Sequence, residues 1–487
     1  MSRQGPQAPV RPSRARRRLR TVGWVVASAL VLGAGGYVAA DAYDVVPGWV
    51  TVAPVPDPPA PFPTAPGAVP AGPLTVTLGH LPTTAPLPAA DEVAALATAL
   101  AADPRMGTSV GIHVVDQLTG EVLADVSGAA PRIPASTAKV LTAVAAVDAL
   151  GSDRTLATRV VQAGPGRIVL VGGGDVMLAA GTGDPDAING RAGLATLAAA
   201  TARNLVLAGT TEVQVSFDDT LFSGPTASPG WAPTDLTGGF VAPVTALAVN
   251  IAKTREEPYP PRVADPSRSA ADTFAAALAA EGVTVTGSVS RATAPADALL
   301  LGTVESATIG EIVRYTLHTS DNTVAEVLGR LVAIEAGLPG SFEGATRAVV
   351  SRIGGLGLDT SQTVLGDCSG LADGSLVPAS VLTGLIRLTA GDREPDLRPV
   401  AVDLPVSGWQ GTMADRLGGL PAHGLVRAKT GSLRGVTSLA GTVLTQDGRQ
   451  LVFAVLADAT PPGGQAAPRN AIDAFVQDLA GCGCQVP

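Results

Sequence analysis

Residues 134–150 read PASTAKVLTAVAAVDAL, an apolar stretch that opens with a proline and contains Ser136 and Lys139. Proline at the first helical position and apolar residues at helical spacing predict a helix that begins at Pro134. Side chains three residues apart lie on one face of a helix, so Lys139 can reach the hydroxyl of Ser136. A desolvated lysine with a lowered pKa can act as the base that a serine nucleophile needs. The alternative, which this stretch favours when taken alone, is a capping serine followed by a solvated lysine.

A second candidate is the triplet Ser320-Asp321-Asn322. Apolar residues at helical spacing over 309–317 and 324–334 predict two helices, with the triplet in the loop between them. A plain cap between the two helices is the alternative, and it is favoured when the triplet is taken alone.

A third candidate is Lys429-Thr430-Gly431-Ser432, which follows an apolar segment at 425–428. This segment and those at 436–444 and 451–457 predict three antiparallel strands, with the motif at the end of the first. Gly431 is expected to let the backbone of a ligand approach closely. The alternative is a polar strand end without a chemical role.

The three motifs are informative as a set. The chain has only three lysines, at positions 139, 253 and 429, and a chance occurrence of all three motifs is expected on the order of 10⁻³ times. Lys139 and Lys429 lie in the two motifs whose chemistry calls for lysine, whereas Lys253 has no such explanation. The set resembles that of the penicillin-recognising serine acyltransferases, which include penicillin-binding proteins and serine β-lactamases.

The spacing narrows the resemblance to a subfamily. Lys139 and Ser320 lie 181 positions apart, which leaves room for a long insertion. This resembles the class C low-molecular-mass penicillin-binding proteins, the D-alanyl-D-alanine carboxypeptidase/endopeptidase family. Other similar segments are Gly173-Gly174-Asp175, Asp218-Asp219-Thr220-Leu221-Phe222, Trp231, Val249-Asn250, Ser369-Gly370-Leu371 and Gly408-x-x-Gly411-Thr412. The resemblance covers about residues 90–481.

The resemblance implies a mixed α/β (α+β) fold, a transpeptidase domain like that of penicillin-binding proteins and serine β-lactamases with a β-rich domain inserted into it. The expected catalytic domain comprises residues 90–153 and 304–487, and the inserted domain residues 154–303. The insertion is shorter than is usual for the family. Ala372-Asp373 also replace a common Ser-Arg pair, whose arginine is associated with recognition of the stem-peptide side chain. The preferred stem peptide is therefore left open.

The resemblance also implies a mechanism that passes through an acyl-enzyme. Ser136 would attack the carbonyl of the penultimate D-Ala of a peptidoglycan stem peptide that ends in D-Ala-D-Ala, with Lys139 as the base. Ser320 would relay a proton to the leaving amine, and Asn322 would orient Lys139 and the substrate amide. Water would then hydrolyse the ester, whereas a β-lactam would leave an adduct that is cleared slowly.

Substrate binding would depend on the third motif. Lys429 would contribute positive potential, while Thr430, Gly431 and Ser432 would bind the substrate, with the Thr430 and Ser432 side chains on its terminal carboxylate. The backbone N–H groups of Ser136 and Ser432 would form the oxyanion hole. The resemblance implies no cofactor.

Two other functions stay open. A β-lactamase or esterase could use the same catalytic plan, although the long insertion and the lack of a clear Glu-x-x-x-Asn segment count against it. A catalytically weak envelope-binding protein is the other alternative. The intact residues of the three motifs count against that one.

The charge of the chain is segregated. The net charge of the 487 residues is −9, but residues 1–20 contain seven arginines and no acidic residue. The remainder carries 26 basic and 42 acidic residues, a net charge of −16, which would repel the phosphates of nucleic acid. The four histidines and three cysteines show no ligand-like spacing, so no metal site is expected.

The N-terminal segments predict export. Residues 21–40 carry no charge over the length needed to cross a bilayer. The basic residues 1–20 favour a cytoplasmic N-terminal tail, with the rest of the chain outside. A single transmembrane anchor is slightly favoured over a cleaved signal peptide, which would give a secreted protein. Residues 41–89 are rich in proline and predict a semi-rigid linker, so we expect an extracytoplasmic protein of the cell envelope.

Overall fold

The computed structural model describes residues 28, 30–41, 81–419 and 421–482. The chain divides into two units, Met1–Leu78 and Gly79–Pro487. In the first unit, residues 30–41 are helical. The expected basic tail, the beginning of the expected membrane segment and most of the linker lie outside the described residues. Within the described ranges, no helix is both long enough and apolar enough to cross a membrane.

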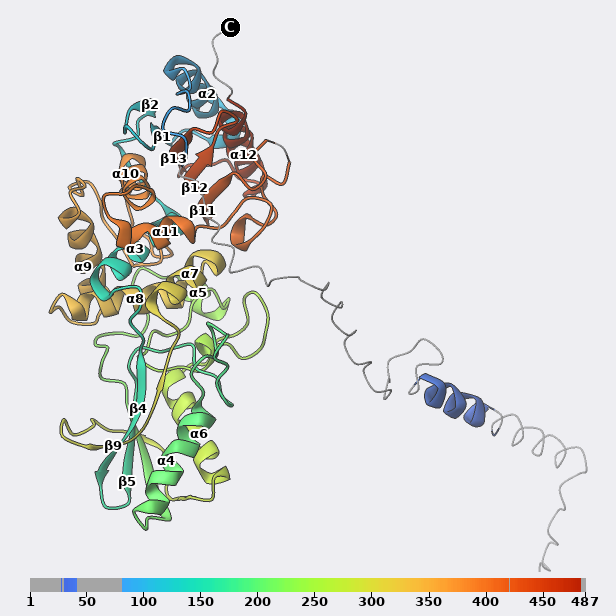
Figure 1. The fold of residues 1–487 in the computed structure, drawn as a ribbon, viewed down its shortest axis with the longest axis vertical. Coiled ribbons are helices and arrows are strands. Elements are labelled where there is room, and N and C mark those ends of the chain that lie inside the picture. The colour runs from blue at the N-terminus through green and yellow to red at the C-terminus, as the bar shows by residue number, and fades with distance from the viewer. Residues whose placement is uncertain (1–27, 29, 42–80, 420, 483–487) are drawn as a thin grey trace, which may run out of the picture. The chain divides into compact units, whose positions relative to one another are not determined.

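The second unit is built around a five-stranded antiparallel sheet with the strand order β11-β12-β13-β1-β2 (Figure 1). Its strands are β1 (Val110–Asp116), β2 (Val122–Val126), β11 (Val426–Leu433), β12 (Val436–Leu444) and β13 (Gln450–Ala457). Along β13, alternate residues belong to two separate buried clusters. An apolar run of this length is typical of a strand that is covered on both faces.

Helices cover both faces of this sheet. The cluster on one face includes residues of α2 (Ala90–Ala102) and α12 (Ala466–Gly481). The cluster on the other face includes residues of α3 (Lys139–Leu150), α7 (Ile309–Thr319), α8 (Asn322–Glu335), α9 (Phe342–Gly355), α10 (Ala379–Ala390) and α11 (Arg398–Val402). A short two-stranded sheet joins β3 (Pro131–Arg132) to β10 (Val377–Pro378).

Most expected elements are confirmed, and one differs. The helix expected to begin at Pro134 starts as a 3₁₀ turn, Ala135–Ala138, and becomes α-helical only at Lys139. The third motif lies at the end of the first strand, as expected, where residues 429–432 pair with β12.

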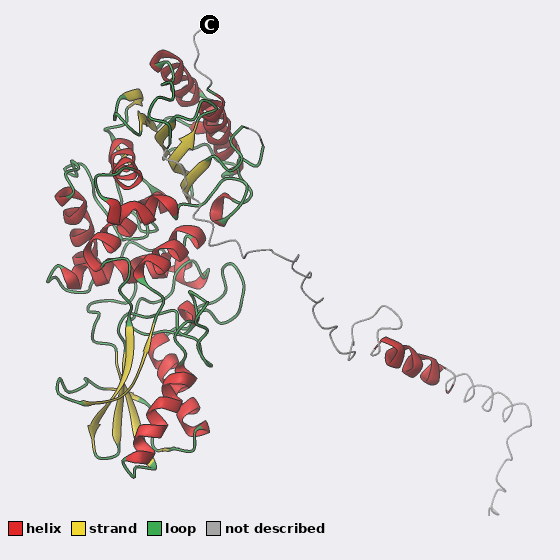
Figure 2. Ribbon diagram, in the orientation of Figure 1, coloured by secondary structure: helices red, strands yellow, loops and turns green. Residues whose placement is uncertain are grey.

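The segment between α3 and α7 forms a second sheet with the order β7-β6-β5-β4-β9, in which β8 pairs with β6. Its strands are β4 (Ala157–Gly164), β5 (Arg167–Val171), β6 (Glu212–Asp218), β7 (Thr284–Val285), β8 (Ser290–Arg291) and β9 (Leu299–Glu305). Helices α4 (Leu194–Leu207) and α6 (Pro266–Ala280) share a buried cluster with this sheet and lie beside it (Figure 2). The expected β-rich insertion is thus present, and two helices complete it.

The chain enters and leaves the second sheet on adjacent strands. β4 and β9 pair antiparallel, with Ala157 opposite Glu305. The domain boundaries at residues 154 and 303 stay a prediction.

Part of the insertion returns to the catalytic helices. The backbone N–H of Ala242 donates to Thr323 Oγ1 at 2.9 Å, and a short helix, α5 (Pro233–Thr237), lies nearby in sequence. Trp231 Nε1 donates to Asp367 Oδ2 at 2.8 Å. These contacts hold the segment that supplies one wall of the cleft described below.

Candidate active site

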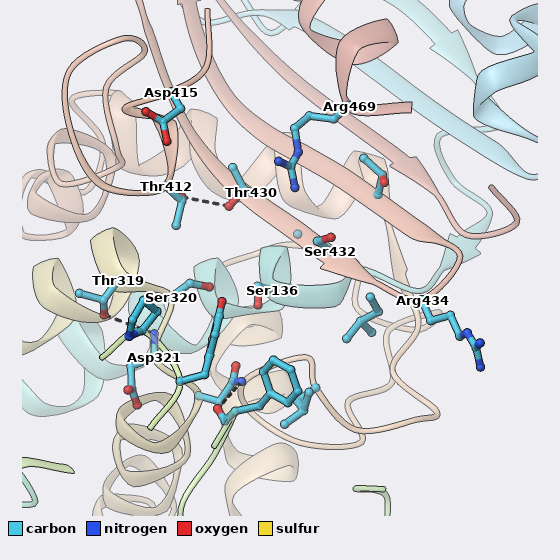
Figure 3. Close-up of a pocket in the computed structure, with 18 of the residues that line it drawn as sticks. Ser136, Thr319, Ser320, Asp321, Thr412, Asp415, Thr430, Ser432, Arg434 and Arg469 are labelled. Carbon is cyan, nitrogen blue, oxygen red and sulfur yellow. Dashed lines mark hydrogen bonds between the residues drawn. The ribbon is translucent and has the colours of Figure 1, made fainter. Parts of the chain in front are cut away.

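The three motifs line one cleft with a volume of about 1040 Å³. Its lining residues include Ser136, Ser320, Asn322, Thr430, Gly431 and Ser432. Ser136 lies between the loop that carries Ser320 and the strand that carries Thr430 and Ser432 (Figure 3). Three segments that are distant in sequence therefore meet around one serine.

Two groups of residues, here called corners, lie behind the cleft. The first corner is formed by Lys139 and its hydrogen-bond partners. Its Nζ donates to Ser136 Oγ at 3.0 Å, to Asn322 Oδ1 at 2.6 Å and to the Ser369 carbonyl at 2.7 Å. The Asn322 Nδ2 group donates to the Phe240 carbonyl at 2.9 Å, which fixes the amide with its oxygen toward Lys139. The oxygens of Asn322 and Ser369 can only accept, so only the Ser136 hydroxyl can donate to a neutral Lys139. The lone pair of the neutral amine is therefore aimed at Ser136.

The Lys139 side chain is fully buried. Burial lowers its pKa to about 8, and the nearby carboxylates of Asp367, Glu326 and Asp321 oppose this decrease. A lysine with this pKa is neutral in a useful fraction of molecules near neutral pH, as a general base must be.

The turn that carries Ser136 is packed closely from two sides. Ala135 has a positive φ of 48°, and Gly370 (φ 77°) leaves no room for a side chain, since a Cβ there would lie 1.9 Å from the Ala135 carbonyl oxygen. A Cβ on Gly431 would lie 2.0 Å from Ser438 Oγ. Ser438 Oγ in turn donates to the Pro134 carbonyl at 2.6 Å. A glycine is thus needed at Gly431 because the Ser438 side chain occupies the space of a Cβ, and the sequence did not reveal this reason.

Lys429 forms the second corner. Its Nζ donates to Ser320 Oγ at 2.9 Å and to the Thr430 carbonyl at 3.0 Å. Burial, and then the charge of Lys139, hold the pKa of Lys429 well below its usual range. Ser320 ends α7 in the left-handed conformation, with φ 57°, while Asp321 Oδ1 accepts from the Val324 N–H and caps α8. The triplet therefore serves both as a cap and as part of the cleft.

The remaining predicted residues lie along β11. Thr430 Oγ1 donates to Thr412 Oγ1 at 2.9 Å, and Ser432 is exposed in the cleft. Arg434 and Arg469 lie further along the same wall (Figure 3). Six of the eight predicted site residues thus line the cleft, and Lys139 and Lys429 lie buried behind it, bonded to Ser136 and Ser320. The catalytic roles of all eight stay proposals.

Several contacts could not be found from side-chain patterns. Segments 369–371 and 411–412 are similar to the family, but the sequence gives no role to the Ser369 carbonyl or to Thr412. Lys253, which had no explanation, lines the cleft. A carbonyl group leaves no signal in a sequence, because every residue has one.

Comparison with known proteins agrees with this geometry. Residues 93–262 and 252–481 match the model of the D-Ala-D-Ala carboxypeptidase 3 (S13) family. The chain is 36% identical over 410 residues to a carboxypeptidase of Mycobacterium tuberculosis, which covers 82% of this chain and 86% of that protein. It is 37% identical over 400 residues to carboxypeptidase DacB of Mycolicibacterium smegmatis, which covers 80% of this chain and 84% of that protein.

A solved structure shows the same fold. Penicillin-binding protein 4 of Haemophilus influenzae superposes with a TM-score of 0.67 at 23% identity, over 78% of this chain and 98% of that chain. The family matches reach across the catalytic segments and the insertion alike, and the family expected from the motifs is confirmed. The chain belongs to the D-Ala-D-Ala carboxypeptidase 3 (S13) family of peptidases, and it is a serine-type carboxypeptidase.

Proposed function

We propose that this enzyme hydrolyses the terminal D-Ala-D-Ala bond of peptidoglycan stem peptides through an ester on Ser136. One observation carries the proposal, the 3.0 Å hydrogen bond between Lys139 Nζ and Ser136 Oγ in a buried corner of the cleft. Membership of the carboxypeptidase family supports the substrate class.

In the first step, neutral Lys139 takes the proton of Ser136 as Oγ attacks the carbonyl carbon of the penultimate D-Ala. The carbonyl electron pair moves onto its oxygen, which the N–H groups of Ser136 and Ser432 would stabilise. Loss of one such donor typically costs about 3 kcal/mol of transition-state stabilisation. Desolvation of Lys139 supports this role, because a base needs a pKa near the working pH.

In the second step, the tetrahedral intermediate collapses and the C–N bond breaks. Ser320 would relay the proton held by Lys139 to the departing amine, and the hydrogen bond from Lys429 Nζ to Ser320 Oγ supports the position of the relaying hydroxyl. D-Ala leaves and Lys139 is neutral again. It would then take a proton from the water that attacks the ester carbonyl and return it to Ser136 Oγ as the ester bond breaks.

The carboxylate of the terminal D-Ala would bind beside β11. Thr430 and Ser432 would donate to it, and Thr412 supports the position of the Thr430 hydroxyl. An anion that arrives near Lys429 favours the charged form of that lysine, so substrate binding would restore the positive charge that burial disfavours.

A D,D-endopeptidase activity on cross-linked peptides is a second candidate. The cleft of about 1040 Å³ is at the upper end of the range for small-molecule sites, and it continues past Ser432 to Arg434 and Arg469. This space would accommodate a peptide as the leaving group. Release of free D-Ala from a pentapeptide, compared with cleavage of cross-linked dimers, measures the two activities separately.

We also propose that the chain is exported and held at the membrane by residues 21–40. The uncharged run after seven arginines supports this placement, as does the cell-wall chemistry of the family. Fractionation of cells that express the full chain tests it. Recovery in the membrane fraction is expected, release to the medium would indicate a cleaved signal, and recovery in the cytosol would contradict export.

Covalent labelling by a fluorescent penicillin tests the acyl-enzyme directly. Wild type is expected to retain the label through denaturation, whereas Ser136→Ala is expected to take up none. Absence of label on folded wild type would contradict the proposal. Rapid turnover of the drug would favour the β-lactamase alternative instead.

A further inference from the structure

Behind Lys139 lies a turn, residues 367–372, that is organised around one buried carboxylate. Asp367 is fully buried. It accepts hydrogen bonds from Trp231 Nε1 (2.8 Å), Ser369 Oγ (2.8 Å) and the backbone N–H groups of Ser369 (3.2 Å), Gly370 (2.6 Å) and Ala372 (2.9 Å). Four of these five donors, the indole N–H and the three backbone N–H groups, cannot accept a hydrogen bond, so both carboxyl oxygens of Asp367 serve as acceptors here.

This turn determines where the Ser369 carbonyl points. Asp367 holds both the N–H and the hydroxyl of Ser369, and the carbonyl of that residue accepts from Lys139 Nζ at 2.7 Å. The next residue, Gly370, packs against the turn that carries Ser136. The base and the nucleophile are thus both in contact with a turn whose shape depends on Asp367.

The other charged groups around Lys139 differ from Asp367. Glu326 of α8 accepts from the Cys368 N–H at 3.2 Å, and the Ser369 hydroxyl also lies near it. Burial raises the pKa of Glu326 well above its usual range, which favours a neutral acid. Asp321 caps α8 and pairs with Arg262 at 3.6 Å, and Lys429 has the same charge as Lys139.

We propose that Asp367 is a positioning residue for acyl transfer. It shapes the 367–372 turn so that the Ser369 carbonyl orients Lys139. Its negative charge also balances the proton that Lys139 takes from Ser136. The proposal rests on the role of Lys139 as the base. It also gives the insertion a part in catalysis, because Trp231 belongs to the inserted segment and supplies one of the five donors. The chain of contacts runs from Trp231 through Asp367 and Ser369 to Lys139.

The test is the rate of acylation by a fluorescent penicillin as a function of pH, in the full-length chain. For Asp367→Asn we expect the rate on the alkaline plateau to fall about 100-fold, since a displaced base costs that much. We also expect the acidic limb to move to lower pH by about one unit, because loss of a neighbouring negative charge lowers the pKa of a lysine. A merely structural role would lower the plateau and leave the limb in place, and that result would overturn the proposal.

Glu326 needs a control, because loss of the Asp367 charge would favour its ionisation. The Glu326→Gln and Asp367→Asn double variant removes this compensation, and its acidic limb is expected to lie at or below that of Asp367→Asn. A limb that returned to the wild-type position in the double variant would contradict the charge balance.

Trp231→Phe tests the proposal without removing the charge, and it decides the matter if Asp367→Asn does not fold. The ring contact with Phe342 can persist, and only the donor is lost. We expect acylation to slow about tenfold, as loss of one hydrogen bond to a charged group predicts. The matched control is Trp409→Phe, at a tryptophan that is 77% exposed, with an unchanged rate. A wild-type rate for Trp231→Phe would overturn the positioning role of Asp367 and its link to the insertion.

Ser136→Ala separates the proposals. If labelled wild type and unlabelled Ser136→Ala establish the acyl-enzyme, a wild-type pH profile in Asp367→Asn refutes only the role of Asp367. If folded wild type takes no label, the proposed function fails before the role of Asp367 is tested.

Discussion

The two corners of the cleft have nearly the same local geometry and different electrostatics. Each has a fully buried lysine whose Nζ lies within hydrogen-bond distance of a serine hydroxyl, at 3.0 Å for Lys139 and Ser136 and 2.9 Å for Lys429 and Ser320. Acidic groups, with Asp367 foremost, oppose the effect of burial on the pKa of Lys139, whereas the charge near Lys429 is that of Lys139 itself. The same pair of side chains can therefore supply a base in one corner and a binding cation in the other.

This difference shows where specialisation arises. The electrostatic difference between the two lysines does not come from the Ser–Lys pairs. It comes from the turn at 367–372 and from α8, which bring acidic groups to Lys139 alone. In the proposed function, the substrate carboxylate would be the counter-ion of Lys429. Substitutions at the two lysines and at the groups beside them test whether the two corners differ in this way.

The largest effect is expected for Lys139→Arg. Arginine keeps the charge but is effectively never deprotonated, so it cannot take the Ser136 proton. The second-order rate of acylation by penicillin should fall about 10⁴-fold, the upper range for loss of a general base. Thermal unfolding of the same sample serves as the control for folding, and retention of more than a few per cent of the rate would argue against Lys139 as the base.

Ser320→Ala should reduce acylation about 10³-fold. This variant lacks the hydroxyl that is proposed to relay a proton to the leaving nitrogen, and Lys429 Nζ loses one of its two oxygen partners. Labelling kinetics measure the change. A loss of less than about tenfold would show that the proton reaches the nitrogen by another path.

The pH dependence of wild type should reflect Lys139. Its neutral form is required, and with a pKa of about 8 the acylation rate should rise about tenfold per unit as the pH increases toward 8. Between pH 6 and pH 8 the total change is about 50-fold, since half of the lysine is still charged at pH 8. A flat profile over this range would mean that the base titrates elsewhere.

Lys429→Arg sharpens the comparison, because here only the charge is needed. We expect a loss of about tenfold in kcat/KM for a D-Ala-D-Ala peptide, mostly in KM, since a guanidinium can still face the carboxylate. Steady-state kinetics on both arginine variants give the contrast. Equal losses at positions 139 and 429 would remove the distinction between the two corners.

The smallest effect is expected for Glu326→Gln, which should change acylation less than about twofold. Glutamine has the shape of the neutral acid that burial favours at this position, and its oxygen can still accept from the Cys368 N–H. The rate and the acidic limb are the measurements. A shift of the limb to lower pH would show that Glu326 is charged and shares the role assigned to Asp367.

The motif residues could be predicted because their chemistry restricts them to particular side chains. Ser136 and Lys139 needed only the spacing of one turn, and the strands and helices around the other motifs followed apolar patterns. Helices α4 and α6 escaped prediction because they are rich in alanine, which gives little contrast between buried and exposed faces.

The role of the 367–372 turn could not be predicted from the sequence for another reason. Its function depends on backbone N–H groups and on one carbonyl, and these are the same in every residue. Trp231 and Asp367 lie 136 positions apart, so the sequence around either residue gives no indication of their hydrogen bond.

The pairing of β4 with β9 also bears on how the chain folds. Thr155 and Glu305 are 150 residues apart and yet joined by a 2.8 Å hydrogen bond. The entropy of closing a loop rises only with the logarithm of its length, so this closure costs roughly 1 kcal/mol more than that of a loop one-third as long. Once the inserted sheet has formed, its paired ends shorten the effective distance along the chain between α3 and α8. Contact between Ser136 and the loop that carries Ser320 then forms over a short effective chain separation, as in a much smaller protein.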